Sequence, residues 1–309
     1  MSQSETSGSP PNANSPTSGG PPKQETGSFW TQKIGGPAIG LSLILGLIKL
    51  TLKQAEQAKR DPRPAQAVQA PDMAKFNAII QGVTRRQIEQ QVDRALAASS
   101  ETLRANPNDG NAYRTRAQSW MSKRNYEKAQ ADLDGSIRVN PNDAEAHRLR
   151  AFVWMQKADF PKAFADLDDA VRLKPTDTKA LVDRAGLRHR RQEFDKAVAD
   201  YVAAIRIDPT NGFAFNGLAW LYATCPDAKY RDGKKAVASA AMACKLTTMK
   251  DPHFIGTLAA AYAEKGDFDN ATKCQWLADN MYSDADKQTW QHLHRLYESG
   301  QPYRDVAKK

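Results

Sequence analysis

The phrase Asn106-Pro-Asn-Asp109 is followed by three near-copies, each 34 residues after the last: Asn140-Pro-Asn-Asp143, Lys174-Pro-Thr-Asp177 and Asp208-Pro-Thr-Asn211. Proline cannot continue a helix, and the Asp or Asn two residues later is a favoured helix N-cap. Each copy therefore predicts the end of one helical hairpin and the start of the next. A fixed period of this length predicts that the hairpins stack into a solenoid.

Residue size follows the same period inside each repeat. Large residues occupy one slot before the second helix, at Tyr126, Phe160 and Phe194. Small residues recur where the two helices must cross closely: Ala117, Ala129, Ala151, Ala163, Ala185 and Ala197. This alternation predicts three regular hairpins over residues 110–211.

These residues resemble the tetratricopeptide repeat (TPR) family, whose pattern has a large residue, a small one, an aromatic, two alanines and a closing proline. The first regular unit follows this pattern, with Ser136 in place of the second alanine, at Tyr113, Ala117, Trp120, Tyr126, Ala129, Ser136 and Pro141. The third unit departs from the pattern at Arg188, which takes the aromatic slot. The resemblance implies an all-α fold, a right-handed solenoid of TPR-type hairpins that serves as an interaction scaffold.

The repeats extend beyond the three regular units in both directions. Residues 72–109 are predicted to form a degenerate first unit, with helices over 73–83 and 88–103. Residues 212–251 form a fourth unit whose turn is lengthened into a loop at 224–233. Residues 252–298 form a last unit with a capping helix, followed by a tail over 299–309. This end of the chain looks like the C-terminal part of many bacterial repeat proteins.

The N-terminal 71 residues have a different composition. Residues 1–33 are rich in Ser, Pro and Gly and predict a disordered tail. Residues 34–52 are apolar except for Lys49, and we interpret them as a single membrane-spanning anchor, with a buried or surface-lying helix as the alternative. Residues 53–71 form a polar linker.

The charges that flank the apolar segment predict its orientation. Only Lys23 and Lys33 precede it, whereas Lys49, Lys53, Lys59, Arg60 and Arg63 lie at its C-terminal end or beyond. By the positive-inside rule, the repeats are expected on the cytoplasmic side. The three cysteines contain no CxxC pair, which agrees with a reducing compartment. The small-residue spacing of Gly36 and Gly40 leaves helix dimerisation as a further reading.

Composition argues against several other functions. The net charge is +9, yet basic and acidic residues are interleaved, so nucleic-acid binding is not favoured. His292 and His294 are two residues apart on a predicted helix and make a poor metal pair. No catalytic arrangement or phosphate-binding loop stands out. The sequence therefore predicts no enzyme activity, no cofactor and no metal.

Two sets of polar residues repeat with the period. Each arginine of the first set takes a first-helix slot and is followed sixteen residues later by an aspartate: Arg116 and Asp132, Arg150 and Asp166, Arg184 and Asp200. We interpret them as structural ion pairs, because a buried guanidinium needs a carboxylate, and an arginine ladder for an acidic ligand remains the alternative.

The second set lines the concave groove expected from periodicity: Arg114, Gln118, Arg148, Phe152, Lys179, His189, Asn216 and Trp220. Aromatic anchors beside basic side chains suit an extended peptide with an acidic group, although a solvated face is the alternative. Phe152 and Trp220 are expected to be exposed, so their replacement by alanine should release a partner without destabilising the chain.

The resulting function is a membrane-anchored scaffold that binds a partner protein or an acidic peptide in the groove. Two alternatives stay open. The chain is an accessory or assembly factor on the outer side of the membrane, or it is the regulatory subunit of an enzyme complex. The sequence leaves the partner and the oligomeric state undetermined.

Overall fold

The computed structural model describes residues 73–282 and 284–305. These residues form twelve α-helices and one short 3-10 helix, and they contain no β-strand. The predicted tail (1–33), membrane anchor (34–52) and linker (53–71) lie outside the described residues. Within the described part of the chain, none of the helices combines the length and the apolar character needed to span a bilayer.

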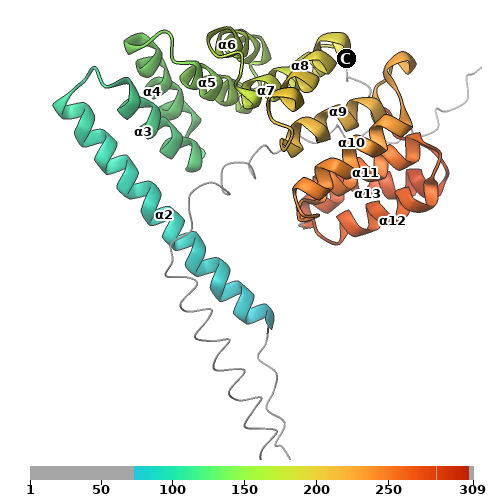
Figure 1. The fold of residues 1–309 in the computed structure, drawn as a ribbon. Helices are drawn as coiled ribbons and strands as arrows, with labels where there is room; N and C mark the ends of the chain where they lie inside the picture. The colour runs from blue at the N-terminus through green and yellow to red at the C-terminus, as the bar shows by residue number, and fades with distance from the viewer. Residues whose placement is uncertain (1–72, 283, 306–309) are drawn as a thin grey trace, which may run out of the picture.

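The first described helix, α2, runs unbroken from Met73 to Ala105. The predicted pair of helices over 73–83 and 88–103 is therefore wrong. The intervening residues 84–87 include neither glycine nor proline, and Arg85 pairs with Glu89 one turn later at 3.1 Å. The C-terminal part of α2 packs on α3 (Gly110–Ser122), while its first turns extend beyond the hairpins (Figure 1).

The three regular units form helical hairpins at the predicted places. After α3 come α4 (Tyr126–Val139), α5 (Ala144–Gln156), α6 (Phe160–Leu173), α7 (Thr178–Arg190) and α8 (Phe194–Ile207). The predicted caps are present, because the side chains of Asp109, Asp143 and Asp177 accept hydrogen bonds from backbone N–H groups in the first turn of α3, α5 and α7. All six crossing alanines are fully buried.

The tight turn inside each regular unit has a left-handed residue at the same slot. Arg124, Ala158 and Gln192 have φ angles of 55°, 60° and 61°, and the last unit has Gly266 there with φ of 85°. The left-handed conformation is strained for residues with a side chain. Packing of the two helices therefore outweighs the local preference of the turn.

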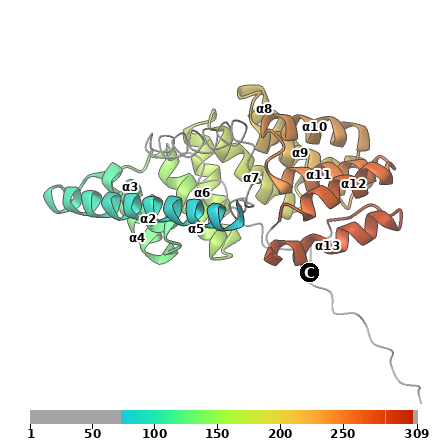
Figure 2. The same cartoon turned by 90° about the horizontal axis from the view of Figure 1, so that it is seen from below.

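The fourth and last units are more closely packed together. They comprise α9 (Gly212–Thr224), the 3-10 helix η2 (Ala228–Tyr230), α10 (Gly233–Leu246), α11 (Pro252–Glu264), α12 (Phe268–Asp279) and the capping helix α13 (Asp284–Glu298). Gly233 is required where α10 begins, since a Cβ there would lie 2.6 Å from backbone atoms of Lys265. Figure 2 shows α11, α12 and α13 gathered at this end, where their side chains share one hydrophobic core.

The hairpins are arranged in two layers. The first helices contact one another from unit to unit: α3 touches α5, α7 touches α9, and α9 touches α11. Each second helix packs between the first helix of its own unit and that of the next. We call the first-helix surface that carries the eight predicted groove residues, from Arg114 on α3 to Trp220 on α9, the inner face.

Candidate functional site

The inner face begins with two arginines that tie neighbouring units together. Arg114 of α3 forms a hydrogen-bonded ion pair with Asp143, the N-cap of α5. Arg148 of α5 repeats the arrangement more loosely, with its Nε atom 3.9 Å from Asp177, the N-cap of α7. In the third unit the arginine slot holds Val182, and the N-cap of the next first helix is the neutral Asn211. Neither partner of the ion pair is therefore charged at this junction. These arginines therefore serve the stacking of units.

Arg148 is buried in addition to being paired. Its side chain is 3% exposed, and it lies 3.6 Å from Glu145 and 3.9 Å from Asp183. The sequence places this guanidinium in an open groove, but the structure covers it. A peptide could reach it only if the surrounding side chains moved.

Phe152 is also buried, which contradicts the expectation that it is an exposed anchor. It is 9% exposed and packs with Ala117, Met121 and Leu149 in the core between the first two regular units. The Tyr126 ring meets it edge-on at 6.5 Å. The first helices of these units stack so closely that a large side chain at this slot fills the junction between them. Phe152 is therefore a core residue.

The junction between the third and fourth units is built differently, around a tyrosine. Tyr201 of α8 takes the slot that holds Leu133 and Leu167 in the earlier units. Its ring lies over Gly217, where a Cβ would come within 2.4 Å of the ring, and its hydroxyl oxygen approaches Gly186 at an ordinary contact distance, 3.9 Å from the position of a Cβ. The missing side chain of Gly217 thus lets a phenol reach from the outer layer toward the inner face.

Three polar side chains surround this junction. Asp183 is partly buried, and burial raises the pKa of its carboxyl group to about 6, although the charge of Arg148 opposes the shift. The Asn216 Oδ1 and His189 Nε2 atoms are buried and have no hydrogen-bond partner among the described residues, and burial lowers the pKa of His189. Buried polar atoms without partners are costly, so they mark a place where a ligand can add hydrogen bonds.

The carboxyl group of Asp183 gives this junction a measurable pH dependence. Its pKa is higher in the folded chain than in the unfolded chain, so its contribution to stability is present below about pH 4 and is lost as the pH rises through 6. Asp183→Asn should therefore raise the free energy of unfolding by about 1 kcal/mol at pH 7.5 and change it little at pH 4. Urea unfolding at both pH values measures this, and a variant less stable at pH 7.5 would contradict the assignment.

Trp220 lies at the far end of the inner face, and the chain's own C-terminal segment covers it. The indole Nε1–H donates to Asp305 Oδ2 at 3.0 Å, and the Tyr303 ring lies 5.8 Å away. Trp290 of α13 meets the indole edge-on at 6.3 Å. The sequence predicts an exposed aromatic here that something must cover. The structure identifies the cover as residues 303–305.

Gln118 and Lys179 are the remaining predicted groove residues, and both are partly exposed on the inner face. They lie on α3 and α7, in units separated by the buried Phe152. The structure therefore places all eight predicted residues on first helices. It leaves accessible surface around Gln118 and Lys179, while Arg148 and Phe152 are covered.

The three predicted Arg–Asp pairs are all present, each with two hydrogen bonds. In Arg116–Asp132 these are 2.8 and 2.6 Å, in Arg150–Asp166 they are 2.9 and 2.7 Å, and in Arg184–Asp200 they are 2.9 and 2.8 Å. Two of the arginines also donate a hydrogen bond to an aspartate of the preceding unit, Arg150 to Asp134 and Arg184 to Asp168, and these contacts were not predicted from the sequence. Hydrogen bonds of these arginines thus connect successive hairpins, which favours a structural role for the pairs.

His147 joins the middle pair, which sequence reasoning did not foresee. Its Nδ1 lies 3.1 Å from Asp166 Oδ1 and its Nε2 lies 3.1 Å from the Pro141 carbonyl oxygen. The hydrogen bond with Asp166 raises the pKa of His147. Asp169 lies close enough to complete a set of three possible metal ligands. However, Asp166 already binds Arg150 through both oxygens, so we assign the cluster to the ion-pair network.

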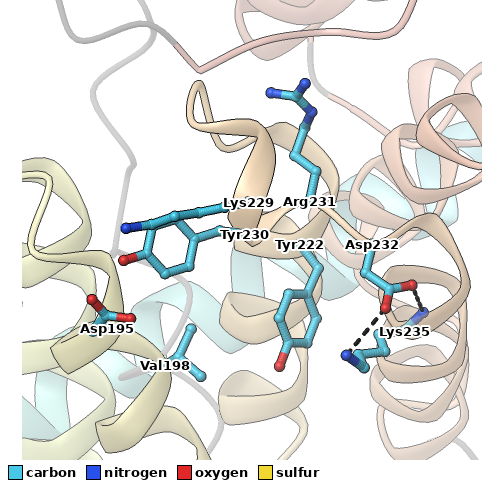
Figure 3. Close-up of a pocket in the computed structure, with 8 residues that line it drawn as sticks. All are labelled: Asp195, Val198, Tyr222, Lys229, Tyr230, Arg231, Asp232 and Lys235. Atoms are coloured by element: carbon cyan, nitrogen blue, oxygen red, sulfur yellow. Dashed lines mark hydrogen bonds and ion pairs between the residues drawn. The ribbon is translucent and has the colours of Figure 1, made fainter.

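A small open hollow of about 270 Å³ lies between α8 and the loop that joins α9 to α10 (Figure 3). The rings of Tyr222 and Tyr230 flank it, and Lys235 pairs with Asp232 at its edge. Arg231 points out of the hollow toward the last unit, where it lies 3.3 Å from Glu264. On the other side, the Tyr230 ring lies 5.2 Å from the ring of Phe194 in α8, so the loop is fastened to both neighbouring units.

Solved structures place this architecture among TPR-like solenoids. A chain of the APC/C hetero-tetramer Cut9–Hcn1 matches with a TM-score of 0.59 at 12% identity, over 82% of this chain and 46% of that one. PilW, a widely conserved type IV pilus biogenesis factor, matches with a TM-score of 0.54 at 17% identity, over 71% of this chain and 99% of that one. YrrB, a TPR protein with an unusual peptide-binding site, matches with a TM-score of 0.48 at 16% identity, over 64% and 98%. No family model and no curated protein sequence matches the chain.

At these identities the likeness concerns the fold. The described residues form an all-helical TPR-like solenoid, as the 34-residue period predicts.

Proposed function

We propose that the chain is a protein-interaction scaffold that binds an extended segment of a partner protein along its inner face. The observation that carries this proposal is the junction of the third and fourth units. There Asn216 Oδ1 and His189 Nε2 are buried beside a half-buried tryptophan, Trp220, and neither atom has a hydrogen-bond partner within residues 73–282 and 284–305. An indole ring next to hydrogen-bonding groups suits a peptide, whose side chain can stack while its backbone supplies donors.

The accessible part of the inner face is expected to contribute affinity through Gln118 and Lys179. Gln118→Ala and Lys179→Ala together should weaken the complex by about tenfold or more. The matched control replaces Arg138 and Arg172, which are exposed at equivalent slots of the second helices α4 and α6. Co-purification of the partner with each variant measures the effect. Equal loss with both pairs would place the binding surface elsewhere.

We also propose that residues 34–52 anchor the scaffold in a membrane with the repeats on the cytoplasmic side. The support comes from the sequence: an apolar run long enough for a short span, and an excess of basic residues after it. The full chain should resist carbonate extraction, and a chain beginning at residue 72 should be soluble. Release of the full chain by carbonate would rule out the span.

A further inference from the structure

Residues 301–305, which follow the capping helix α13, turn back across the repeats, and the capping role of α13 does not require this path. Gly300, with φ of 70°, ends α13 and turns the chain, and Pro302 prevents the helix from resuming. Residues 301–305 then run without regular structure back to α9, more than 80 positions earlier in the sequence, where Asp305 meets Thr224 and Trp220. The segment therefore lies on the inner face.

Each of three successive residues in this segment makes a different kind of contact. The Tyr303 ring lies against the indole of Trp220, and burial raises the pKa of its hydroxyl group to about 12. Arg304 forms an ion pair of 2.7 Å with Glu264 of α11. Asp305 accepts the hydrogen bond from the Trp220 indole N–H at 3.0 Å. The α9–α11 surface thus contacts an aromatic, a basic and an acidic side chain that follow one another in the sequence.

The backbone of the segment is recognised as well. α9 ends at Thr224, so the last carbonyl groups of the helix have no helical N–H to accept from. The Asp305 N–H donates to the Thr224 carbonyl oxygen at 2.8 Å, and the Arg304 guanidinium lies 3.5 Å from the Ala223 carbonyl oxygen. Any peptide that follows the same path across the end of α9 could donate a backbone N–H to the Thr224 carbonyl oxygen in the same way.

We propose that residues 301–305 are an intramolecular ligand of the α9–α11 part of the inner face, and that a partner peptide with an aromatic, a basic and an acidic residue in this order binds there by displacing them. This proposal rests on the proposed function and adds to it the sequence chemistry of the partner. The segment holds the face closed until a partner competes for Trp220 and Glu264.

Tethering explains why the segment would act as a gate. A ligand attached by a short linker has an effective concentration in the millimolar range, so even weak contacts keep the site occupied. A free peptide with the same contacts must overcome this competition. Removing the tether should therefore unmask the affinity of the site.

The test uses a fluorescently labelled peptide of residues 301–309, Gln-Pro-Tyr-Arg-Asp-Val-Ala-Lys-Lys. Fluorescence anisotropy measures its binding to the full chain and to a chain that ends at Gly300. We expect the shortened chain to bind the peptide at least about tenfold more tightly than the full chain. Peptide carrying Tyr303→Ala and Asp305→Ala should lose at least about tenfold in affinity for the shortened chain.

Two further variants keep the result interpretable. The full chain with Tyr303→Ala and Asp305→Ala keeps its length, and it should bind the unchanged peptide as the shortened chain does. Trp220→Phe in the shortened chain keeps an aromatic ring but removes the N–H donor, so it should weaken binding by about fivefold. Circular dichroism verifies that each chain is folded.

We call the chain that ends at Gly300 and the full chain with Tyr303→Ala and Asp305→Ala the opened chains. The proposal would be overturned if the peptide bound the unchanged full chain and the opened chains equally well. It would also be overturned if the peptide bound neither opened chain although both were folded. This outcome is separate from failure of the proposed function. If Gln118 and Lys179 prove essential for binding of the partner while the peptide does not bind the opened chains, the scaffold proposal stands. Residues 301–305 are then a structural cap.

Discussion

Replacing Arg150 by alanine should lower the free energy of unfolding by about 3 kcal/mol. Asp166 is 4% exposed, and both of its oxygens accept hydrogen bonds from the Arg150 guanidinium. Without the arginine, the buried carboxylate would keep His147 as its one side-chain partner in the described part of the chain. The same variant also loses the link from Arg150 to Asp134 in the preceding unit. Urea unfolding monitored by circular dichroism measures the change.

The pH dependence of this effect has a defined sign. Burial alone would raise the pKa of Asp166, but the hydrogen bonds from His147 and Arg150 hold it below its usual value. A lowered folded pKa gives stability that is present above about pH 4 and is lost as the pH falls through the folded value. The difference between the wild-type chain and Arg150→Ala should therefore shrink in acid.

Two controls separate the ion pair from a general loss of packing. Arg172 is exposed on α6, so Arg172→Ala should change the free energy of unfolding by less than about 0.5 kcal/mol. Arg150→Leu combined with Asp166→Leu should recover much of the loss, because an apolar pair avoids the unpaired buried charge. If Arg150→Ala proves silent, the arginine is not structural and returns to the ligand-binding candidates.

Phe152→Ala should also destabilise the chain by about 3 kcal/mol, since truncation of a buried phenylalanine leaves a cavity. The ring is packed between α3 and α5 against Ala117, Met121 and Leu149. Trp276 on α12 is a matched control, because it is a large aromatic that is 61% exposed. Trp276→Ala should change the stability by less than about 0.5 kcal/mol. A Phe152→Ala chain of unchanged stability that loses its partner would restore Phe152 as a binding anchor.

The parts of the fold that follow from local chemistry could be predicted from the sequence. The repeated proline phrase located each hairpin boundary, because a proline stop and an Asp or Asn cap act within a few residues. The Arg–Asp pairs were predictable for a related reason, since two charges at a constant spacing meet whenever the hairpin repeats. The second acidic contacts, at Asp134 and Asp168, cross between units, and the pattern within one unit does not reveal them.

The candidate site was less predictable, because burial on the inner face depends on neighbouring units. Helical periodicity assigns Phe152 and Trp220 to equivalent slots, yet one fills the junction of two units and the other lies under the C-terminal segment. The room for Tyr201 on α8 comes from a glycine on another helix, Gly217 of α9. Each such contact joins residues that are far apart in the sequence. Such pairs leave no periodic signal.

Site-specific photocrosslinking tests the central claim, that the inner face binds the partner, most directly. One chain carries a photoreactive residue in place of Lys179 on α7, and a second carries it in place of Arg172 on α6. The inner-face proposal predicts a crosslinked partner from position 179, none from position 172, and a stronger adduct when the chain ends at Gly300. An adduct formed from position 172 and absent at position 179 would contradict it.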